Sequence, residues 1–267
     1  MTRIATWNVN SIKARTDLVA LWLKTAKPDL LLLQELKCKD DDFPRIPFER
    51  LGYCIEAVGQ KSYNGVAILS RLPLRIEHRR LPGEPADDQA RYIEAAVEKP
   101  ASNKHRRETF RVASLYLPNG NPAGSENFAY KLRWLERLVL HARRLREEGQ
   151  PAILGGDFNV APTDADVYDA FLWGNDALCR QEVRAKFRAL LHLGFSDAIA
   201  TLHPEPGHYT FWDYQNRAWT KNHGWRIDHL LLSPQALARL VGCGVDTEMR
   251  GKANPSDHVP VWCDLKT

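Results

Sequence analysis

The sequence contains little cysteine and no long apolar run. Its five cysteines are odd in number, far apart and free of C-x-x-C spacing. This pattern argues against a disulfide framework and against a zinc ribbon. No stretch approaches the roughly 20 apolar residues of a membrane-spanning helix, and the first ten residues lack the basic start and apolar core of a secretory signal. We therefore expect a cytoplasmic protein that has no membrane partner.

The chain also lacks a strong excess of charge, an internal repeat and a low-complexity linker. Its 37 basic and 33 acidic residues leave a net charge of +4, which favours anionic partners such as nucleic acid only mildly. With 267 residues, of which 44% are hydrophobic, it can bury one large core or two small ones. Because no linker divides it, we expect residues 1–267 to form a single domain, and we expect a monomer.

Short apolar runs rich in branched residues recur along the chain and predict mostly buried strands. They are RIATWNV, DLLLLQE, GVAILS, YIEAAVE, FRVASLYL, PAILGGDFN, IDHLLLS and PVWCDL. Helical spacing of apolar residues is found over about 15–27, 128–148 and 181–193. The alternation predicts an α/β fold in which helices cover the outer faces of two sheets. Polar stretches near 82–90 and the basic stretch 99–109 predict surface loops within that domain.

Polar side chains follow many of these runs, where a strand would leave the core. The set comprises Asn8, Asn10, Glu35, Tyr116, Asn119, Asp157, Asn159, Asp228, Asp257 and His258. Strand ends of this kind can converge on one rim of a sheet assembly.

Each of these residues, taken alone, also fits an ordinary structural role. Glu35 fits a surface carboxylate, and the pair Asp257 and His258 fits a loop cap. The segment GGDFN fits a glycine-assisted turn, Asn8 fits an edge-strand residue, and the nearby aromatic residues fit a packed core.

Together, however, these residue types are what a metal-dependent phosphodiesterase requires. Carboxylates such as Glu35 and Asp157 suit Mg²⁺, which can polarise a phosphoryl oxygen. A carboxylate near the phosphate can activate a water, and asparagines can donate hydrogen bonds to the developing charge. A histidine held by an acid, here His258 with Asp228, can stay charged beside the phosphate. The combination therefore favours phosphodiester hydrolysis over separate structural roles.

Several motifs follow one another along the chain: WNVNSIKAR, LLLQELK, YNGVAILS, YLPNG, GGDFNVAPTDAD, YTFWDY, GWRIDHLLLS and PSDHVPV. In this order they resemble the exonuclease III family of DNA-repair nucleases, within the wider endonuclease/exonuclease/phosphatase superfamily. The resemblance runs from Thr6 to Val261; each motif is weak, but the ordered set is specific. It implies a four-layer α/β sandwich of two packed, mostly antiparallel sheets flanked by helices, with the active site at one end of the sheets.

The resemblance also implies roles for individual residues, with Mg²⁺ as the cofactor and Mn²⁺ as a substitute. The implied metal site comprises Asn8, Glu35, Asp157, Asn159, Asp257 and His258. The implied catalytic residues are Tyr116, Asp157, Asn159, Asp228 and His258. The implied substrate contacts are Asn10, Asn119, Phe211, Trp225 and Ile227. Among these, Asp157 would activate the attacking water and Asp228 would orient His258.

An apolar pocket for a baseless deoxyribose is implied by Phe211, Trp225 and Ile227, because a flipped sugar without a base presents an apolar face. The alternative for Phe211 is simple packing between the sheets. Two features depart from or vary within the family pattern. Leu36 stands where many relatives have threonine, and Leu178 lies in a variable segment where it could crowd or admit an abasic sugar.

The leading hypothesis is a Mg²⁺-dependent nuclease that acts on double-stranded DNA, cuts 5′ to abasic sites and trims blocked or normal 3′ ends. Water attacks phosphorus and leaves a 3′-hydroxyl. One alternative keeps the chemistry but assigns a small or lipid phosphoester, although no apolar membrane-docking loop is evident. Another is a catalytically silent DNA-binding module, and the presence of Glu35, Asp157 and His258 argues against it.

Overall fold

The computed structural model describes residues 1–100 and 107–266, which contain two six-stranded sheets. The first sheet has the order β11-β12-β1-β2-β4-β3 and the second β5-β6-β7-β8-β10-β9. In each sheet one neighbouring pair is parallel, β1 with β2 and β7 with β8, and the other pairs are antiparallel. The predicted pair of mostly antiparallel sheets is confirmed.

The strands of the first sheet are β1 (Thr2–Asn8), β2 (Leu30–Gln34), β3 (Cys54–Val58), β4 (Val66–Ser70), β11 (Leu240–Val245) and β12 (Val261–Leu265). Those of the second are β5 (Leu74–His78), β6 (Tyr92–Pro100), β7 (Arg107–Tyr116), β8 (Ala152–Asp157), β9 (Ser196–Asp197) and β10 (Asp228–Leu232). The α-helices are α1 (Ile12–Ala26), α2 (Arg45–Glu49), α3 (Glu126–Glu147), α4 (Ala170–Trp173), α5 (Gln181–His192), α6 (Ala198–Leu202) and α7 (Pro234–Leu237). Short 3-10 helices span Asp40–Asp42, Asp164–Asp166 and Thr247–Gly251.

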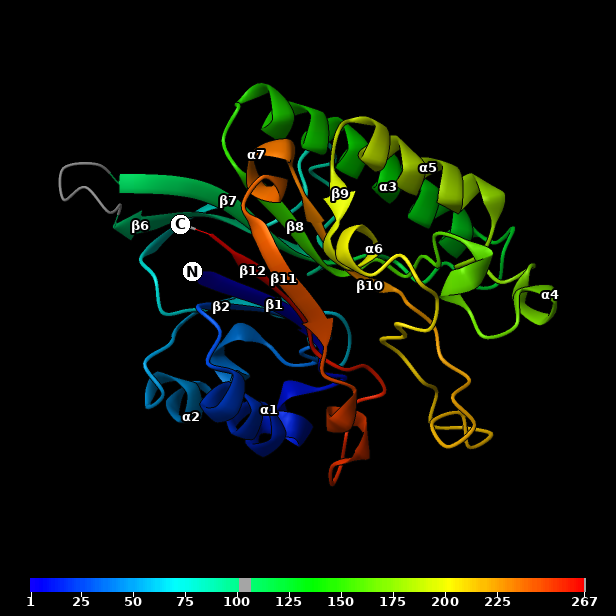
Figure 1. Cartoon of the computed structure of the whole chain (residues 1–267), viewed down its shortest axis with the longest axis horizontal. Helices are drawn as coiled ribbons and strands as arrows, with labels where there is room; N and C mark the ends of the chain where they lie inside the picture. Colours follow the sequence, from blue (N-terminus) through cyan, green and yellow to red (C-terminus); the bar gives the residue numbers. More distant parts are fainter. Residues whose placement is uncertain (101–106, 267) are drawn as a thin grey trace.

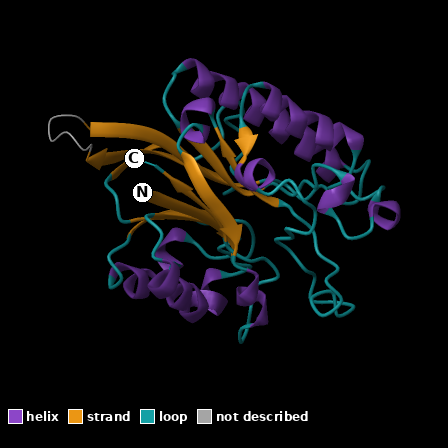
Figure 2. Cartoon of the chain, viewed as in Figure 1, coloured by secondary structure: helices purple, strands orange, loops and turns teal. Residues whose placement is uncertain are grey.

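The sheets pack face to face between two helical layers, with α1 and α2 on one outer side and α3 and α5 on the other (Figures 1 and 2). The alternation of side chains along β2 shows why. Leu30 and Leu32 belong to the core between the sheets, whereas Leu31 and Leu33 belong to the core under α1. A run of four leucines therefore serves two cores at once. The result is the four-layer α/β sandwich that the sequence predicts.

Close contact between the sheets explains one glycine of the GGDFN motif. A Cβ on Gly155 would lie 2.5 Å from Leu32 Cδ1 and 2.8 Å from Leu230 Cδ2. Those distances are far shorter than van der Waals contact, so a side chain here would push the layers apart. Gly155 thus fixes the spacing of the sheets immediately before β8 delivers Asp157 to its end.

The structure corrects some predicted boundaries. Helix α1 begins at Ile12 rather than near residue 15, and β3, β5, β9 and β11 were not predicted. The two ends of the basic stretch 99–109 are strand rather than loop, because β6 continues to Pro100 and β7 begins at Arg107; its middle, 101–106, lies outside the described residues. The stretch 82–90 does lack helix and strand. In the described ranges no helix has both the length and the apolar character that crossing a membrane requires.

Candidate active site

The strand registers bring the predicted polar residues together at one end of the sheets. In the second sheet Asp157 pairs with Tyr116 on one side and with Asp228 on the other. In the first sheet Asn8, at the end of β1, pairs with Gln34 of β2, directly before Glu35. The Asn8 amide then links the sheets, because its Nδ2 donates to Glu35 Oε1 and to Asp157 Oδ2, both at 2.9 Å.

Glu35 is held rigidly rather than exposed as a surface carboxylate. Its second oxygen, Oε2, lies 2.8 Å from Lys37 Nζ, and only 16% of its side chain is exposed. Its φ of 52° lies in the left-handed region, a conformation that costs a non-glycine residue about 1–3 kcal/mol and is concentrated at functional sites. Burial alone would raise the pKa of Glu35, but the charge of Lys37 and hydrogen bonds from Asn8 and Lys37 lower it. The carboxylate therefore stays ionised.

His258 lies between two carboxylates. Its Nδ1 is 2.8 Å from Asp228 Oδ2, and its Nε2 is 3.8 Å from Asp157 Oδ2. Burial alone would lower the pKa of His258, but the charges of Asp228 and Asp157 and the hydrogen bond with Asp228 raise it to about 10. At neutral pH the imidazole is therefore a cation that Asp228 orients and whose Nε2–H faces the carboxylate of Asp157.

Asp157 is fully buried at the centre of the site. Burial is the main cause of its raised pKa, the charge of Asp228 adds to that shift, and His258 opposes it. The backbone N–H of Asn159 donates to its Oδ1 at 2.8 Å, while Oδ2 faces Asn8 and His258. A carboxylate whose pKa lies near neutrality is suited to accept a proton from water.

A row of amides and one phenol completes the polar wall. Asn119 Nδ2 donates to Asn159 Oδ1 at 3.2 Å, and Asn159 Nδ2 donates to the carbonyl of Leu117 at 2.9 Å. Burial, followed by the charges of Glu35 and Asp157, raises the pKa of Tyr116 well above its ordinary value. The phenol therefore keeps its proton and serves as a hydrogen-bond donor.

Beneath the amides lies Lys131, a residue that sequence reasoning missed. Its Nζ is fully buried and donates to the carbonyls of Asn119 and Asn159, at 2.8 and 2.6 Å. Burial lowers the pKa of Lys131 to about 7, and the two bonds satisfy this buried amine and hold both loops in place. In the sequence, Lys131 is one of many polar residues of an amphipathic helix, and no pattern marks it as inward-facing.

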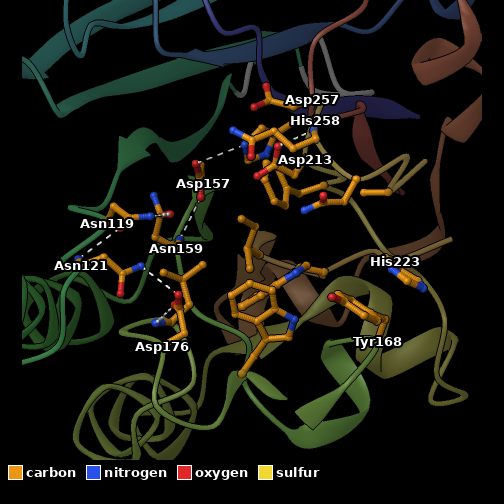
Figure 3. Close-up of a pocket in the computed structure, with 18 of the residues that line it drawn as sticks. Asn119, Asn121, Asp157, Asn159, Tyr168, Asp176, Asp213, His223, Asp257 and His258 are labelled. Carbon is orange, nitrogen blue, oxygen red and sulfur yellow. Dashed lines mark hydrogen bonds and ion pairs between the residues drawn. The ribbon is translucent and has the colours of Figure 1, made fainter. Parts of the chain in front are cut away.

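The polar wall borders a cavity of about 350 Å³, within the usual range of ligand pockets. Figure 3 shows Asp157, Asp257 and His258 toward one end of it and Tyr168 with His223 toward the other. Its lining includes the predicted residues Glu35, Tyr116, Asn119, Asp157, Asn159, Phe211, Trp225, Ile227, Asp257 and His258, and also Leu178. Two further predicted residues bond to this lining: Asn8 donates to Glu35, and Asp228 bonds to His258.

The opposite wall of the cavity is apolar and aromatic. The backbone of Phe211 forms isolated antiparallel β-bridges with Trp225 and with His258, and the ring centroid of Phe211 lies 4.8 Å from that of His258. Trp225 and Ile227 also belong to the core beneath α3 and α5, so these two residues both pack in the core and line the cavity. Sequence reasoning missed two parts of this wall: Trp173, edge-on to Trp225, and the stacked rings of Tyr168 and His223, 4.2 Å apart.

The geometry separates the predicted metal ligands into two groups. Ligand atoms of Glu35, Asp157 and His258 lie within 4.8 Å of one another. Asn8 faces this cluster with its amide nitrogen, since its oxygen accepts from the backbone N–H of Asn10. The side chains of the other two predicted ligands have protein partners: Asn159 bonds to Asn119 and Leu117, and Asp257 Oδ1 accepts from Asn10 Nδ2 at 3.0 Å.

Comparisons with known proteins identify the family of the chain. Residues 5–258 match the model of the endonuclease/exonuclease/phosphatase family. The chain is 29% identical to exodeoxyribonuclease III of Haemophilus influenzae, over 99% of this chain and all of that protein. Its structure resembles an AP endonuclease from Archaeoglobus fulgidus (TM-score 0.91, 36% identity) and a 3′ phosphatase from Neisseria bound to a product DNA hairpin (TM-score 0.92, 38% identity). Both structural matches cover 100% of each chain.

Proposed function

The chain belongs to the endonuclease/exonuclease/phosphatase family and is a nuclease of the exonuclease III type; from that premise we propose that it acts on double-stranded DNA, cutting 5′ to abasic sites and removing 3′-blocking groups or 3′ nucleotides. One observation carries the proposal: three side chains of the phosphodiesterase type line one wall of a cavity whose opposite wall is apolar. They are the ionised Glu35, the buried Asp157 and His258, which Asp228 orients. We further propose that residues 1–267 act as one domain and as a monomer, in a reducing compartment such as the cytoplasm.

The carboxylates fit a divalent cation. Glu35 and Asp157 approach each other from opposite sheets, and the Asn8 amide fixes one oxygen of each. Oxygen ligands of this kind suit Mg²⁺, with Mn²⁺ as a substitute, and the bound ion would supply positive charge at the scissile phosphate. As an imidazolium, His258 has no lone pair to offer a metal, so we assign it to the phosphate instead.

The chain's own groups account for the remaining steps. Asp157 accepts a proton from the attacking water, because burial keeps the pKa of this carboxylate high enough for it to act as a base. The imidazolium of His258, the hydroxyl of Tyr116 and the amides of Asn119 and Asn159 donate hydrogen bonds to the phosphate as its negative charge grows. Cleavage leaves a 3′-hydroxyl.

The apolar wall supports selection of a sugar without a base. Phe211, Trp225 and Ile227 offer a surface with few polar groups, and Trp173 and Leu178 narrow the space that a base would occupy. A flipped abasic deoxyribose would fit, whereas an intact nucleotide would leave its base edge without partners. Contacts from lysine and arginine side chains to the DNA backbone would supply affinity that does not depend on sequence.

The proposal is tested with end-labelled duplexes that carry a central abasic analogue, a 3′-phosphate or no lesion, each incubated with Mg²⁺ or with a chelator. We expect Mg²⁺-dependent incision on the 5′ side of the abasic analogue and removal of the 3′-phosphate. If only 3′ ends are processed, the assignment of the apolar wall to abasic sugars is wrong. If none of the duplexes is cut, the assignment to DNA fails as a whole.

A further inference from the structure

Outside the cavity, side chains of the types that bind metals gather in the loop HPEPGH that follows α6 (Figure 1). His203, Glu205 and His208 place one ligand atom each within 4.8 Å of the other two. The carboxylate oxygen Oε1 of Glu205 is 3.6 Å from His203 Nδ1 and 3.1 Å from His208 Nε2. We propose that this loop binds a Zn²⁺ ion, separate from the cation of the nuclease site.

The ligand types and spacings fit zinc better than magnesium. Zn²⁺ takes imidazole nitrogens and a carboxylate oxygen at about 2.0–2.2 Å, so neighbouring ligands of a tetrahedral site lie about 3.3 Å apart. The two distances to Glu205 Oε1 bracket that value. Mg²⁺ prefers an octahedron of oxygens, which two imidazoles do not provide.

The surroundings of His203 favour the tautomer that a metal ligand needs. His203 Nε2 lies 3.3 Å from the carbonyl oxygen of Cys243, and a carbonyl can only accept a hydrogen bond. In the neutral ring the proton therefore belongs on Nε2, and Nδ1, the nitrogen that faces Glu205, keeps its lone pair. Metal-binding histidines are commonly held in this way by a backbone carbonyl at the second nitrogen.

The loop is pre-shaped and accessible. Pro204 and Pro206 flank Glu205, and Gly207 adopts a φ of 97°, a left-handed conformation that favours glycine and turns the chain toward His208. The side chains of His203 and His208 are 39% and 30% exposed, so an ion can enter. A cavity of about 170 Å³ adjoins the three residues and leaves space for a water as the fourth ligand.

The position of the loop gives the ion a structural consequence. His208 is followed closely by Thr210, which donates to Asp228 Oδ2 at 2.6 Å, and by Phe211 of the apolar wall. An ion bound by His203 and His208 would join the end of α6 to the start of this segment. Zinc would therefore stabilise the fold and support the cavity wall from outside, whatever substrate the cavity accepts.

The experiment is a Zn²⁺ titration of the full chain by calorimetry, in excess Mg²⁺ so that the oxygen-rich nuclease site is occupied. The variants are His203→Ala, His208→Ala and Glu205→Gln, and the matched control is His192→Ala, an exposed histidine on α5. We expect wild type and the control to bind one more equivalent of Zn²⁺ than either loop alanine variant. Glu205→Gln should bind at least about tenfold more weakly, because it retains the shape of the side chain but loses the charge.

Thermal melting provides the second readout. Saturating Zn²⁺ should raise the melting midpoint of the wild type by about 4 °C and leave that of His208→Ala unchanged, while all variants melt alike in a chelator. If the wild type and His208→Ala bind equal amounts of Zn²⁺ and show equal thermal shifts, the proposal is overturned. Because both readouts are independent of DNA cleavage, they test this site separately from the proposed nuclease.

Discussion

Two buried acid and histidine pairs each contain one of two consecutive residues of β10, Asp228 and His229, and only one of the pairs faces the cavity. Asp228 holds His258 at 2.8 Å, and Asp197 holds His229 at 2.6 Å. In the second pair each group has further protein partners: His229 Nε2 lies 3.1 Å from the carbonyl of Val160, and Asp197 also binds Arg226 and caps α6. In the first pair, Nε2 of His258 faces the cavity and Asp157.

Burial and pairing with an acid therefore do not by themselves prepare a histidine for catalysis. His229 has both of its nitrogens engaged by the fold and packs against the rings of Phe158 and Phe187. His258 has one nitrogen engaged and one directed at the space where a phosphate would lie. We therefore call Asp228 with His258 the open pair, and Asp197 with His229 the closed pair.

The largest expected effect comes from breaking each pair at its histidine. His258→Asn should lower turnover by about 10³-fold, because a charged donor to the phosphate is lost, while the fold is retained. His229→Asn should leave the turnover of folded protein near that of wild type and lower the free energy of unfolding by about 1–3 kcal/mol. Steady-state cleavage and urea denaturation of both variants check this. A greater loss of turnover in His229→Asn would contradict the distinction.

The closed pair should also govern stability in acid. Burial alone would raise the pKa of Asp197, but Arg226 and His229 lower it far below the value of about 3.9 in an unfolded chain. Its contribution is therefore present above pH 4 and lost as the pH falls toward the folded value.

Asp197→Asn should cost about 3–5 kcal/mol at pH 7 and make the loss of stability below pH 4 less steep than in wild type. Urea denaturation between pH 3 and 7 measures both. An acid dependence identical to that of wild type would show that Asp197 is not the group responsible.

The open pair should govern the alkaline limb of the activity. Asp228 is the leading cause of the raised pKa of His258, so Asp228→Asn should lower that pKa, and the active imidazolium should be lost as the pH rises through the lower value. We expect kcat/KM of the variant to fall between pH 8 and 9, where Asp157 of the wild type is already ionised and the wild-type profile is level. Asp197→Asn is the control and should keep the wild-type profile. An unshifted pH profile in Asp228→Asn would show that Asp228 does not raise the pKa of His258.

A smaller effect should follow from the buried amine beneath the amides. Lys131→Met removes two hydrogen bonds to the loops of Asn119 and Asn159, so turnover should fall by about tenfold while KM changes little. Arg137→Met, on the same helix, removes a cation that bonds to the carbonyl of Leu81 and to Asp87. It should lose stability without that loss of turnover. Equal turnover in the two variants would deny Lys131 a positioning role.

The sequence predicted the open pair but not its counterpart. His258, Asp228 and Asp157 follow or precede apolar runs, and strand registers turn such positions into neighbours, as the pairing of Asp157 with Asp228 confirms. The pairing of His229 was not predicted because His229 lies inside the apolar run IDHLLLS, and a residue inside such a run is expected to pack in the core. Its role depends on Asp197, which the fold brings within hydrogen-bond distance from another strand.

Other residues escaped prediction for related reasons. β11 contains Gly242 and Gly244, which weaken a strand pattern, yet Trp262 of β12 covers Gly244 so closely that a Cβ there would lie 2.7 Å from its ring. Tyr168 belongs to a loop and Trp173 to a short helix, and neither segment has a periodic pattern of apolar residues. Position relative to a strand end is readable from sequence, whereas the direction of a loop or helix side chain depends on packing.

The most direct test of the account is single-turnover cleavage of a duplex with an abasic analogue by Asp157→Asn, with DNA affinity measured in parallel at one salt concentration. The substitution removes the proton acceptor, keeps the shape of the site and leaves the lysine and arginine residues of the chain unchanged. We expect wild-type affinity and a rate lower by about 10³-fold or more. Cleavage near the wild-type rate would contradict the central role given to Asp157.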